Sequence, residues 1–375
     1  MLELPRHAEI WLLPYVVDRV RRRIARTLVR RVWVAICDHY EPFWRGADET
    51  LATERVSTWR RQWPAIATRI IDSTGRCPKY SFFYAQEEYR PDLLAQLADM
   101  VHSGFADVEV HIHHDRQGRQ NFIDRISTFI ETLVQRHGLL RQYEGKIRFG
   151  FIHGDWALDN SLPKGIHCGL NDEISILRDL GCYADFTMPS GNSYSQSRTV
   201  NRLYWAIDDP NAPKSYDRGV PASRGGGVCG DLLMIAGPLG LAFSGRMLPR
   251  LETGELAGYA LPTESRVRSW LDLAPTIGED LFLKLFSHGS QERNSVALLS
   301  GALEFTYRAL AAESSRRGCS LYFVSAWEMY CAIQRICSGV SPLVNGTPAS
   351  CTHIPDHSTQ HCERHDSLLS TTTRA

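Results

Sequence analysis

Several common signals are missing from this sequence of 375 residues, and each absence excludes a class of protein. No run of about 18 uninterrupted apolar residues occurs, so we expect no membrane-spanning helix. Basic and acidic residues number 42 each. This balance argues against a protein that coats nucleic acid, because neutralising phosphates requires an excess of Lys and Arg. The N-terminus has no basic region ahead of an apolar core, so we expect no signal peptide.

The cysteines also lack a recognisable arrangement. None of the ten forms a CxxC pair, which argues against a structural zinc knuckle. They are scattered along a long chain, unlike the dense spacing of a small disulfide scaffold. A hydrophobic fraction of 43% is ordinary for a globular enzyme and excludes a disordered chain. We therefore expect a cytoplasmic protein with mostly reduced thiols.

A basic amphipathic helix is predicted near the N-terminus. Within residues 16–31, Val16, Val20, Ile24 and Leu28 recur every four positions, and most of the other residues are Arg. This pattern is typical of a helix with one apolar and one basic face. The pattern has two interpretations. In one, the helix packs on the domain with its arginines in solvent. In the other, it makes a peripheral contact with a membrane or an anionic polymer.

The composition changes again at Ser341. From there the chain is rich in Ser, Thr, His and Pro and has no apolar period, which predicts a disordered tail over residues 341–375. Histidines recur every four residues in this tail, with cysteines nearby, and such tracts are weak indicators of metal binding. They are His353, His357, His361 and His365, with Cys351 and Cys362.

Strand-like and helix-like patterns alternate over residues 32–340, which follow a lead-in of residues 1–31. A strand followed by a helix, repeated about eight times, predicts an α/β protein with a parallel sheet. At this length we expect one domain, an irregular (β/α) barrel of seven to eight parallel strands, rather than an open doubly wound sheet. No GxGxxG loop follows the first strand, which argues against a dinucleotide site. The predicted strands are 32–37, 79–84, 108–113, 146–152, 184–188, 231–236, 281–286 and 320–324.

Polar residues gather where these strands end. In (β/α) barrels the carboxyl ends of the strands and the loops after them build the active site. Five of the predicted strands deliver polar groups to this rim. The candidates carried forward are Asp38 and His39 after the first strand, His111 and His113 in the third, His153, Asp155, Trp156, Asp159 and Asn160 after the fourth, and His288 after the seventh.

The segment HIHH suggests a metal site. Side chains alternate across a strand, so His111 and His113 share one face with Glu109, while His114 faces the other way. Two imidazoles two residues apart can bind one metal ion, and a carboxylate such as Asp38 could complete the set. The alternative is that these histidines only bind substrate or each other.

Two residues are candidates for proton transfer. Asp38 ends an apolar strand, where a carboxylate costs free energy unless it is paired, so it is either a base with a perturbed pKa or half of a structural ion pair. His288 ends LFLKLFSHG, and Gly289 lets the chain turn sharply after it. We expect His288 to act as a general acid or to bind substrate.

Asp38, the histidines of EVHIHHD and the histidine of FSHG together resemble the polysaccharide deacetylases of the glycoside hydrolase/deacetylase superfamily. The resemblance implies that Asp38 matches the catalytic aspartate, His288 the late acid histidine and His113 a metal histidine. Two positions depart from the family pattern. His39 stands in place of a second aspartate, and Gln117 in place of a second metal histidine, so that His39 and His111 would have to replace the usual ligands.

The resemblance further implies an activity. It is a metal-dependent hydrolase of carbohydrate C–N (amide) bonds that removes N-acetyl or O-acetyl groups from a poly- or oligosaccharide. A divalent cation, zinc in the first instance, would be bound by His39, His111 and His113. Asp38 would take the proton of the attacking water, and His288 would protonate the departing amine. The sugar would contact His153, Asp155, Trp156, Asp159 and Asn160.

Two alternatives from other classes stay open. A glycoside hydrolase would use paired carboxylates, for instance Asp38 with Asp155. A glycan-binding barrel without a metal would use the same rim only for recognition. Neither nucleic acid nor a dinucleotide is an expected partner.

Overall fold

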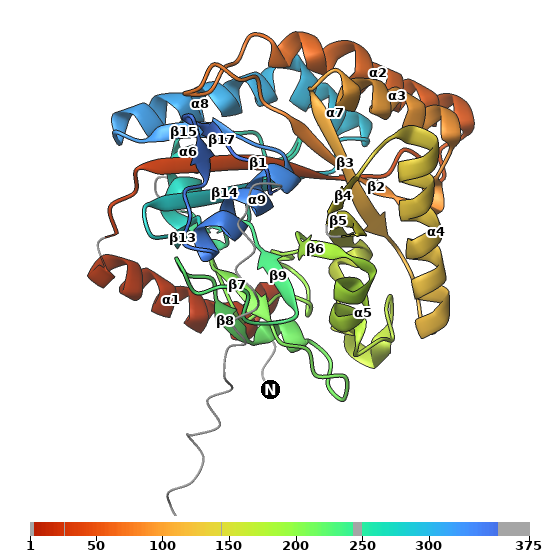
Figure 1. Ribbon diagram of the computed structural model, residues 1–375, viewed down its shortest axis with the longest axis horizontal. Coiled ribbons are helices and arrows are strands. Elements are labelled where there is room, and N and C mark those ends of the chain that lie inside the picture. The colour runs from red at the N-terminus through yellow and green to blue at the C-terminus, as the bar shows by residue number, and fades with distance from the viewer. Residues whose placement is uncertain (1–3, 26, 144, 243–249, 352–375) are drawn as a thin grey trace, which may run out of the picture.

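The computed structural model describes residues 4–25, 27–143, 145–242 and 250–351. It is a mixed α/β protein built on one large, mostly parallel sheet (Figure 1). The eight predicted strands are all present and all pair in parallel with a neighbour. They are β1 (Arg31–Tyr40), β2 (Tyr80–Ala85), β3 (Ala106–Ile112), β5 (Lys146–His153), β6 (Cys182–Asp185), β9 (Leu232–Ile235), β14 (Asp280–Ser287) and β15 (Ser320–Phe323).

The expected barrel closure is not confirmed, because the sheet is open. The strand order is β12-β14-β1-β2-β3-β5-β6-β9-β7-β8, and β15 pairs with β1. The outer edge of β14 bonds to two short strands, β12 (Glu255–Leu256) and β13 (Thr276–Ile277). The outer edge of β9 bonds to the antiparallel β7 (Leu203–Ala206), which is followed by β8 (Gly219–Pro221). Both edges are thus occupied, and side chains span the gap: Lys284 Nζ donates to the Met188 carbonyl (3.2 Å), and Arg224 pairs with Asp280 (3.5 Å).

Helices cover one face of the sheet. Figure 1 shows α2 to α5 following one another around the outside, and apolar residues of these helices share one core with the even-numbered residues of β1. Asp48 caps the first of them, and α4 and α5 end at Gly138 and Gly181, which both adopt the left-handed conformation. The helices on this face are α2 (Glu49–Ala67), α3 (Pro91–His102), α4 (Arg119–His137), α5 (Glu173–Leu180), α6 (Glu264–Leu273) and α8 (Leu303–Arg316), with the short α7 (Glu292–Ala297).

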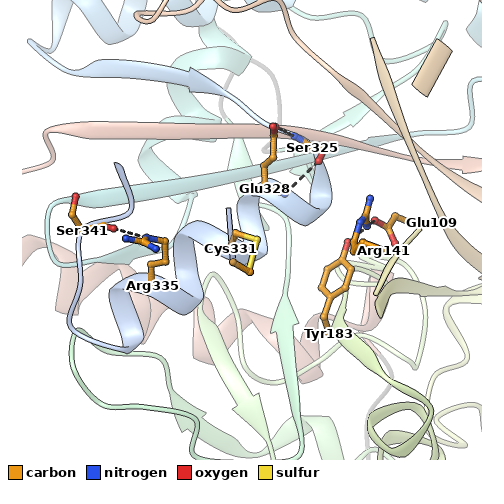
Figure 2. The surroundings of a disulfide bond; sticks show 9 residues. Glu109, Arg141, Tyr183, Ser325, Glu328, Cys331, Arg335 and Ser341 are labelled. Atoms are coloured by element: carbon orange, nitrogen blue, oxygen red, sulfur yellow. Dashed lines mark hydrogen bonds and ion pairs between the residues drawn. A yellow bond between two sulfur atoms is a disulfide. The ribbon is translucent and has the colours of Figure 1, made fainter. Parts of the chain in front are cut away.

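A second core fills the other face of the sheet. Odd-numbered residues of β1, such as Trp33 and Cys37, pack there with α9 (Ala326–Cys337). Ser325 begins this helix in a capping box with Glu328. On the same side Glu109 accepts from Tyr183 Oη (2.8 Å) and pairs with Arg141 of β4 (Arg141–Tyr143), as Figure 2 shows.

The N-terminal helix packs through a different face from the predicted one. Helix α1 (Ala8–Ala25) buries Ile10 and Trp11. The predicted stripe faces solvent instead, with Val20 51% and Ile24 77% exposed. The helix is docked by Arg22, which donates to the carbonyls of Ala274 and Asn201. The peripheral membrane contact stays a prediction. Within the described ranges, no helix has the length and apolarity needed to cross a membrane.

The predicted disordered tail is wrong for residues 341–351. A small hairpin of β16 (Leu343–Val344) and β17 (Thr347–Pro348) follows α9. A Cys331–Cys351 disulfide, which the scattered cysteine spacing did not predict, ties it to α9 (Figure 2). Arg335 adds a bond to the Ser341 carbonyl (2.6 Å). The four tail histidines and Cys362 lie outside the described residues. Two further short strands, β10 (Gly240–Ala242) and β11 (Arg250–Glu252), pair with each other.

Candidate metal centre

Three side chains converge where β1 and β3 end. Glu41 directly follows β1, His111 lies in β3, and His113 follows β3. One potential ligand atom from each lies within 4.8 Å of the others. His111 is buried, whereas the side chains of Glu41 and His113 are 14% and 34% exposed. We call these three residues the rim group.

Both imidazoles of the rim group point Nε2 at the same carboxylate oxygen. His111 Nδ1 donates to the Ile152 carbonyl (2.9 Å), because a carbonyl can only accept, and this leaves Nε2 toward Glu41 Oε1 at 3.2 Å. His113 Nε2 lies 3.7 Å from that oxygen, while its Nδ1 pairs with Glu87. A histidine whose outer nitrogen is held by a carbonyl or a carboxylate is the usual arrangement around a bound metal.

The charges of the rim group complement one another. Burial would raise the pKa of Glu41, but the hydrogen bond and charge of His111, with the charges of His288 and His113, lower it to about 2. Burial would lower the pKa of His113, but its bond to Glu87 and the charges of Glu87 and Glu41 raise it to about 9. The carboxylates of Glu41 and Glu87 thus offset the positive charge of His113. They would equally favour a metal cation bound at the rim group.

A glycine makes room for the exposed imidazole. Gly154, immediately after β5, is buried against the His113 ring. A methyl group on Gly154 would lie 2.2 Å from His113 Cδ2, far inside contact distance. The position of His113 therefore depends on the absence of a side chain at Gly154.

Three aromatic side chains lie beside the rim group. His39 stacks on His288 with ring centres 4.7 Å apart, and Trp156 lies 5.9 Å from His39 and 6.0 Å from His288. His39 also contacts His111 at 5.3 Å. Burial lowers the pKa of His39 well below its usual range and that of His288 to about 4, so both rings are neutral at pH 7. In the described part of the chain, His39 Nε2 and Trp156 Nε1 are buried without a hydrogen-bond partner.

Asp38 lies on the helix-facing side of β1, opposite His39. Its Oδ2 accepts from Tyr80 Oη (2.5 Å), and both oxygens accept from the Gly289 amide (2.8 and 3.0 Å). Burial raises the pKa of Asp38 to about 7. The structure thus places Asp38 behind the turn that carries His288, and the ligand group contains Glu41 rather than Asp38.

A second group of potential ligands lies on the helix-facing side of the sheet. His114, His153, Cys168 and Glu173 each offer an atom within 4.8 Å of the others, and all four residues are buried. The group, called the inner group below, could hold a metal ion. His153 is fully buried, with Nε2 3.0 Å from His114 Nε2 and 3.2 Å from Glu173 Oε1. Its expected contact with substrate is therefore corrected: in this structure His153 contacts the inner group instead.

The remaining predicted sugar contacts lie in the segment after β5. Asp155 is exposed and lies 3.4 Å from His167. Asp159 is buried and accepts from the Ser215 amide (2.6 Å). Asn160 donates to Asn171 Oδ1 (2.6 Å). Asp159 and Asn160 therefore secure this segment. Trp156 lies against His39 and His288, and the charge of Asp155 acts on His113 of the rim group.

Comparisons with known proteins leave the activity open. No family model matches the chain, and no curated protein matches it. Among solved structures the chain is similar to a GH57 branching enzyme from the archaeon Thermococcus kodakaraensis, crystallised with glucose. The TM-score is 0.36 and the identity 9%, over 88% of this chain and 72% of the other. A likeness of this size assigns neither fold nor activity, and it does not confirm the deacetylase resemblance.

Proposed function

We propose that this chain is a metal-dependent hydrolase that removes acetyl groups from an N- or O-acetylated poly- or oligosaccharide. The observation that carries the proposal is the convergence of Glu41, His111 and His113 on one point, partly open to solvent. Two histidines and one glutamate are a ligand set of catalytic zinc sites, which leave a position open for water or substrate.

The donor atoms fit a divalent cation. The Nε2 atoms of His111 and His113 face Glu41 Oε1 at 3.2 and 3.7 Å, and each Nδ1 is engaged elsewhere. Once a cation displaces the proton of His113, the rim group offers two nitrogen donors and one carboxylate oxygen. When bound, the cation would lower the pKa of a water molecule and polarise the acyl carbonyl. His39, named as a ligand from the sequence, lies beside this set and contacts His111 ring to ring.

His288 is the proposed proton carrier. Because its pKa is about 4, the ring is neutral at pH 7 and can accept a proton from the attacking water. The water oxygen bonds to the acyl carbon, the bond from that carbon to the sugar nitrogen or oxygen breaks, and His288 returns the proton to the leaving atom. Acetate and the free amine or hydroxyl are the products. Asp38, bonded to the Gly289 amide, positions the turn that carries His288.

The proposed substrate class rests on two points. The sequence motifs around Asp38, His113 and His288 resemble those of polysaccharide deacetylases. Trp156 provides an indole beside the rim group, and indoles stack on the apolar faces of sugar rings.

The test is acetate release by the purified full chain from a chito-oligosaccharide and from an O-acetylated xylo-oligosaccharide. We expect release that is lost with a chelator, restored by Zn²⁺, and absent in His113→Ala but present in the surface variant His102→Ala. New reducing ends without acetate would replace the proposal with glycoside hydrolysis. Binding without any product would replace it with a glycan-binding protein.

A further inference from the structure

The inner group has the dimensions of a closed metal site. His114 Nε2 lies 2.9 Å from Glu173 Oε1, and Cys168 Sγ lies 3.4 Å from Glu173 Oε2. The two histidine Nε2 atoms are 3.0 Å apart. Atoms that share one tetrahedral zinc ion lie about 3.3–3.6 Å from each other. The distances among the two histidine Nε2 atoms and Glu173 Oε1 are thus a few tenths of an ångström shorter than around zinc, and Cys168 offers its sulfur within 4.8 Å of the other ligand atoms.

The hydrogen bonds around His153 and Glu173 leave electron pairs directed at one point. His153 Nδ1 lies 2.6 Å from the Gly154 carbonyl, so it carries the hydrogen, and Nε2 of the neutral ring does not. Glu173 Oε2 accepts from the Asp159 amide (2.6 Å), which leaves Oε1 facing both imidazoles. With neutral rings, at most one hydrogen lies among these three atoms, on His114 Nε2. A cation among them would be a common partner for all three.

Cys168 is surrounded as a metal thiolate would be. The backbone amides of Asn160 (3.3 Å) and Leu170 (3.5 Å) both donate to its sulfur. These two bonds favour the charged form, but burial and the charge of Glu173 raise the pKa of the Cys168 thiol, so the thiolate requires a cation beside it. No solvent reaches the Cys168 side chain, which argues against a nucleophile that must meet substrate.

We propose that His114, His153, Cys168 and Glu173 form a second, structural metal site that binds zinc. The set of two nitrogens, one sulfur and one oxygen suits zinc better than magnesium or calcium, which prefer oxygen alone. All four residues are buried, and four-coordinate closed sites are structural rather than catalytic. The ion would join the ends of β3 and β5 to the segment before α5 and to the first turn of α5. This proposal does not rest on the proposed function.

Cobalt provides a test that is separate from activity. Co²⁺ bound to a thiolate absorbs in the near ultraviolet through sulfur-to-metal charge transfer, and the rim group contains no sulfur. We expect this band in the wild type after exchange of the bound metal for one equivalent of Co²⁺, and also in Glu41→Gln, whose rim group is disabled. We expect the band to be lost in Cys168→Ser.

Two cysteine variants are the matched controls. Cys182 is also buried but lies outside both groups, and Cys362 lies in the tail. Cys182→Ser and Cys362→Ser should therefore keep the band. Glu173→Gln keeps the sulfur and the side-chain shape but loses the charge, and we expect its affinity for Co²⁺ to fall at least tenfold. It serves as the second variant should Cys168→Ser fail to fold.

The outcomes separate this proposal from the proposed function. A wild type without the band, or an unchanged band in Cys168→Ser, would overturn the inner site whatever the activity. Loss of the band in Cys362→Ser alone would assign the metal to the tail and overturn it as well. A band that survives in an inactive, rim-disabled chain supports the inner site, even if no acetate is ever released by the wild type.

Discussion

The rim group and the inner group differ by one step of strand alternation. His113 and His114 are consecutive, yet His113 belongs to the partly exposed rim group and His114 to the buried inner group. The same alternation separates Ile152, which packs on the side of the sheet covered by α9, from His153, which faces helices α2 to α5 on the other side. Two consecutive histidines thus lie in different environments, one partly exposed and one buried.

Solvent access distinguishes what the two groups can do. The rim group has three ligands, an exposed histidine and neutral imidazoles next to it, which suits chemistry on a substrate. The inner group has four ligands and no exposed one, which suits a fixed ion. Loss of the inner group should therefore reduce stability, and loss of the rim group should reduce activity.

The largest expected effect is on folding, in His153→Ala. This change removes a partner of His114 and leaves the buried Glu173 carboxylate without one of its histidines. Leaving a buried group without its partner costs about 1–3 kcal/mol, and more when the group is charged. We expect that loss in the free energy of urea unfolding, against less than about 0.5 kcal/mol for the surface variant His102→Ala. A loss below about 1 kcal/mol in His153→Ala would show that the inner group does not stabilise the fold.

The second effect is on activity, in Glu41→Gln. The amide keeps the size of the side chain but removes the charge shared by His111 and His113. We expect acetate release to fall more than about 100-fold, because a direct ligand should matter more than the outer partners whose loss costs 10–100-fold. The unfolding free energy should change by less than about 1 kcal/mol. The neighbouring Glu88→Gln is the control. Equal activity losses in the two variants would contradict the role of the rim group.

The third effect is smaller, in Glu87→Gln. Glu87 pairs with His113 Nδ1 and directs the other ring nitrogen toward Glu41. Weakening such an outer partner lowers metal affinity by about 10–100-fold. Competition with a chromophoric zinc chelator measures it, with the cobalt–thiolate band of the inner group as an internal reference that should not change. An affinity equal to that of the wild type would remove Glu87 from the site.

Much of this arrangement could be predicted from strand periodicity. The eight strands, and the pairing of His111 with His113, follow from apolar runs and from alternation. The sequence pattern did not point to Glu41, because the apolar run of the first predicted strand ends at Cys37, whereas β1 continues to Tyr40. With the longer strand, Glu41 lies one alternation beyond His39, on the same side. Phe149 and Phe151 pack toward the helices, and the same alternation would have placed His153 with them.

Other features depend on contacts that the sequence does not display. The sheet does not close into a barrel because β12 and β13 occupy the edge of β14. Each is two residues long, and strands this short have no period that the sequence could reveal. Cys168 and Glu173 join the histidines of the inner group only through the irregular segment after β5. That segment turns through left-handed backbone at Asp159, Asn160 and Gly169, positions that sequence patterns do not specify.

The smallest expected effect isolates burial from metal binding. Glu252 is a buried carboxylate outside both groups, bonded to Arg266 and Trp270. Burial would raise the pKa of Glu252, but the bond and charge of Arg266 and the Trp270 bond lower it. A lowered folded-state pKa contributes stability above the ordinary value of 4.5, and this contribution is lost as the pH falls below 4.5. We expect Glu252→Gln to lower the free energy of unfolding by about 1 kcal/mol at pH 7 and by less at pH 4, measured by urea unfolding.

Because Glu252 belongs to neither metal group, this loss of stability should be the same with zinc and with a chelator. The loss in His153→Ala should instead shrink once zinc is removed. If both differences respond alike to zinc, the contrast between a buried ion pair and the inner group would not hold.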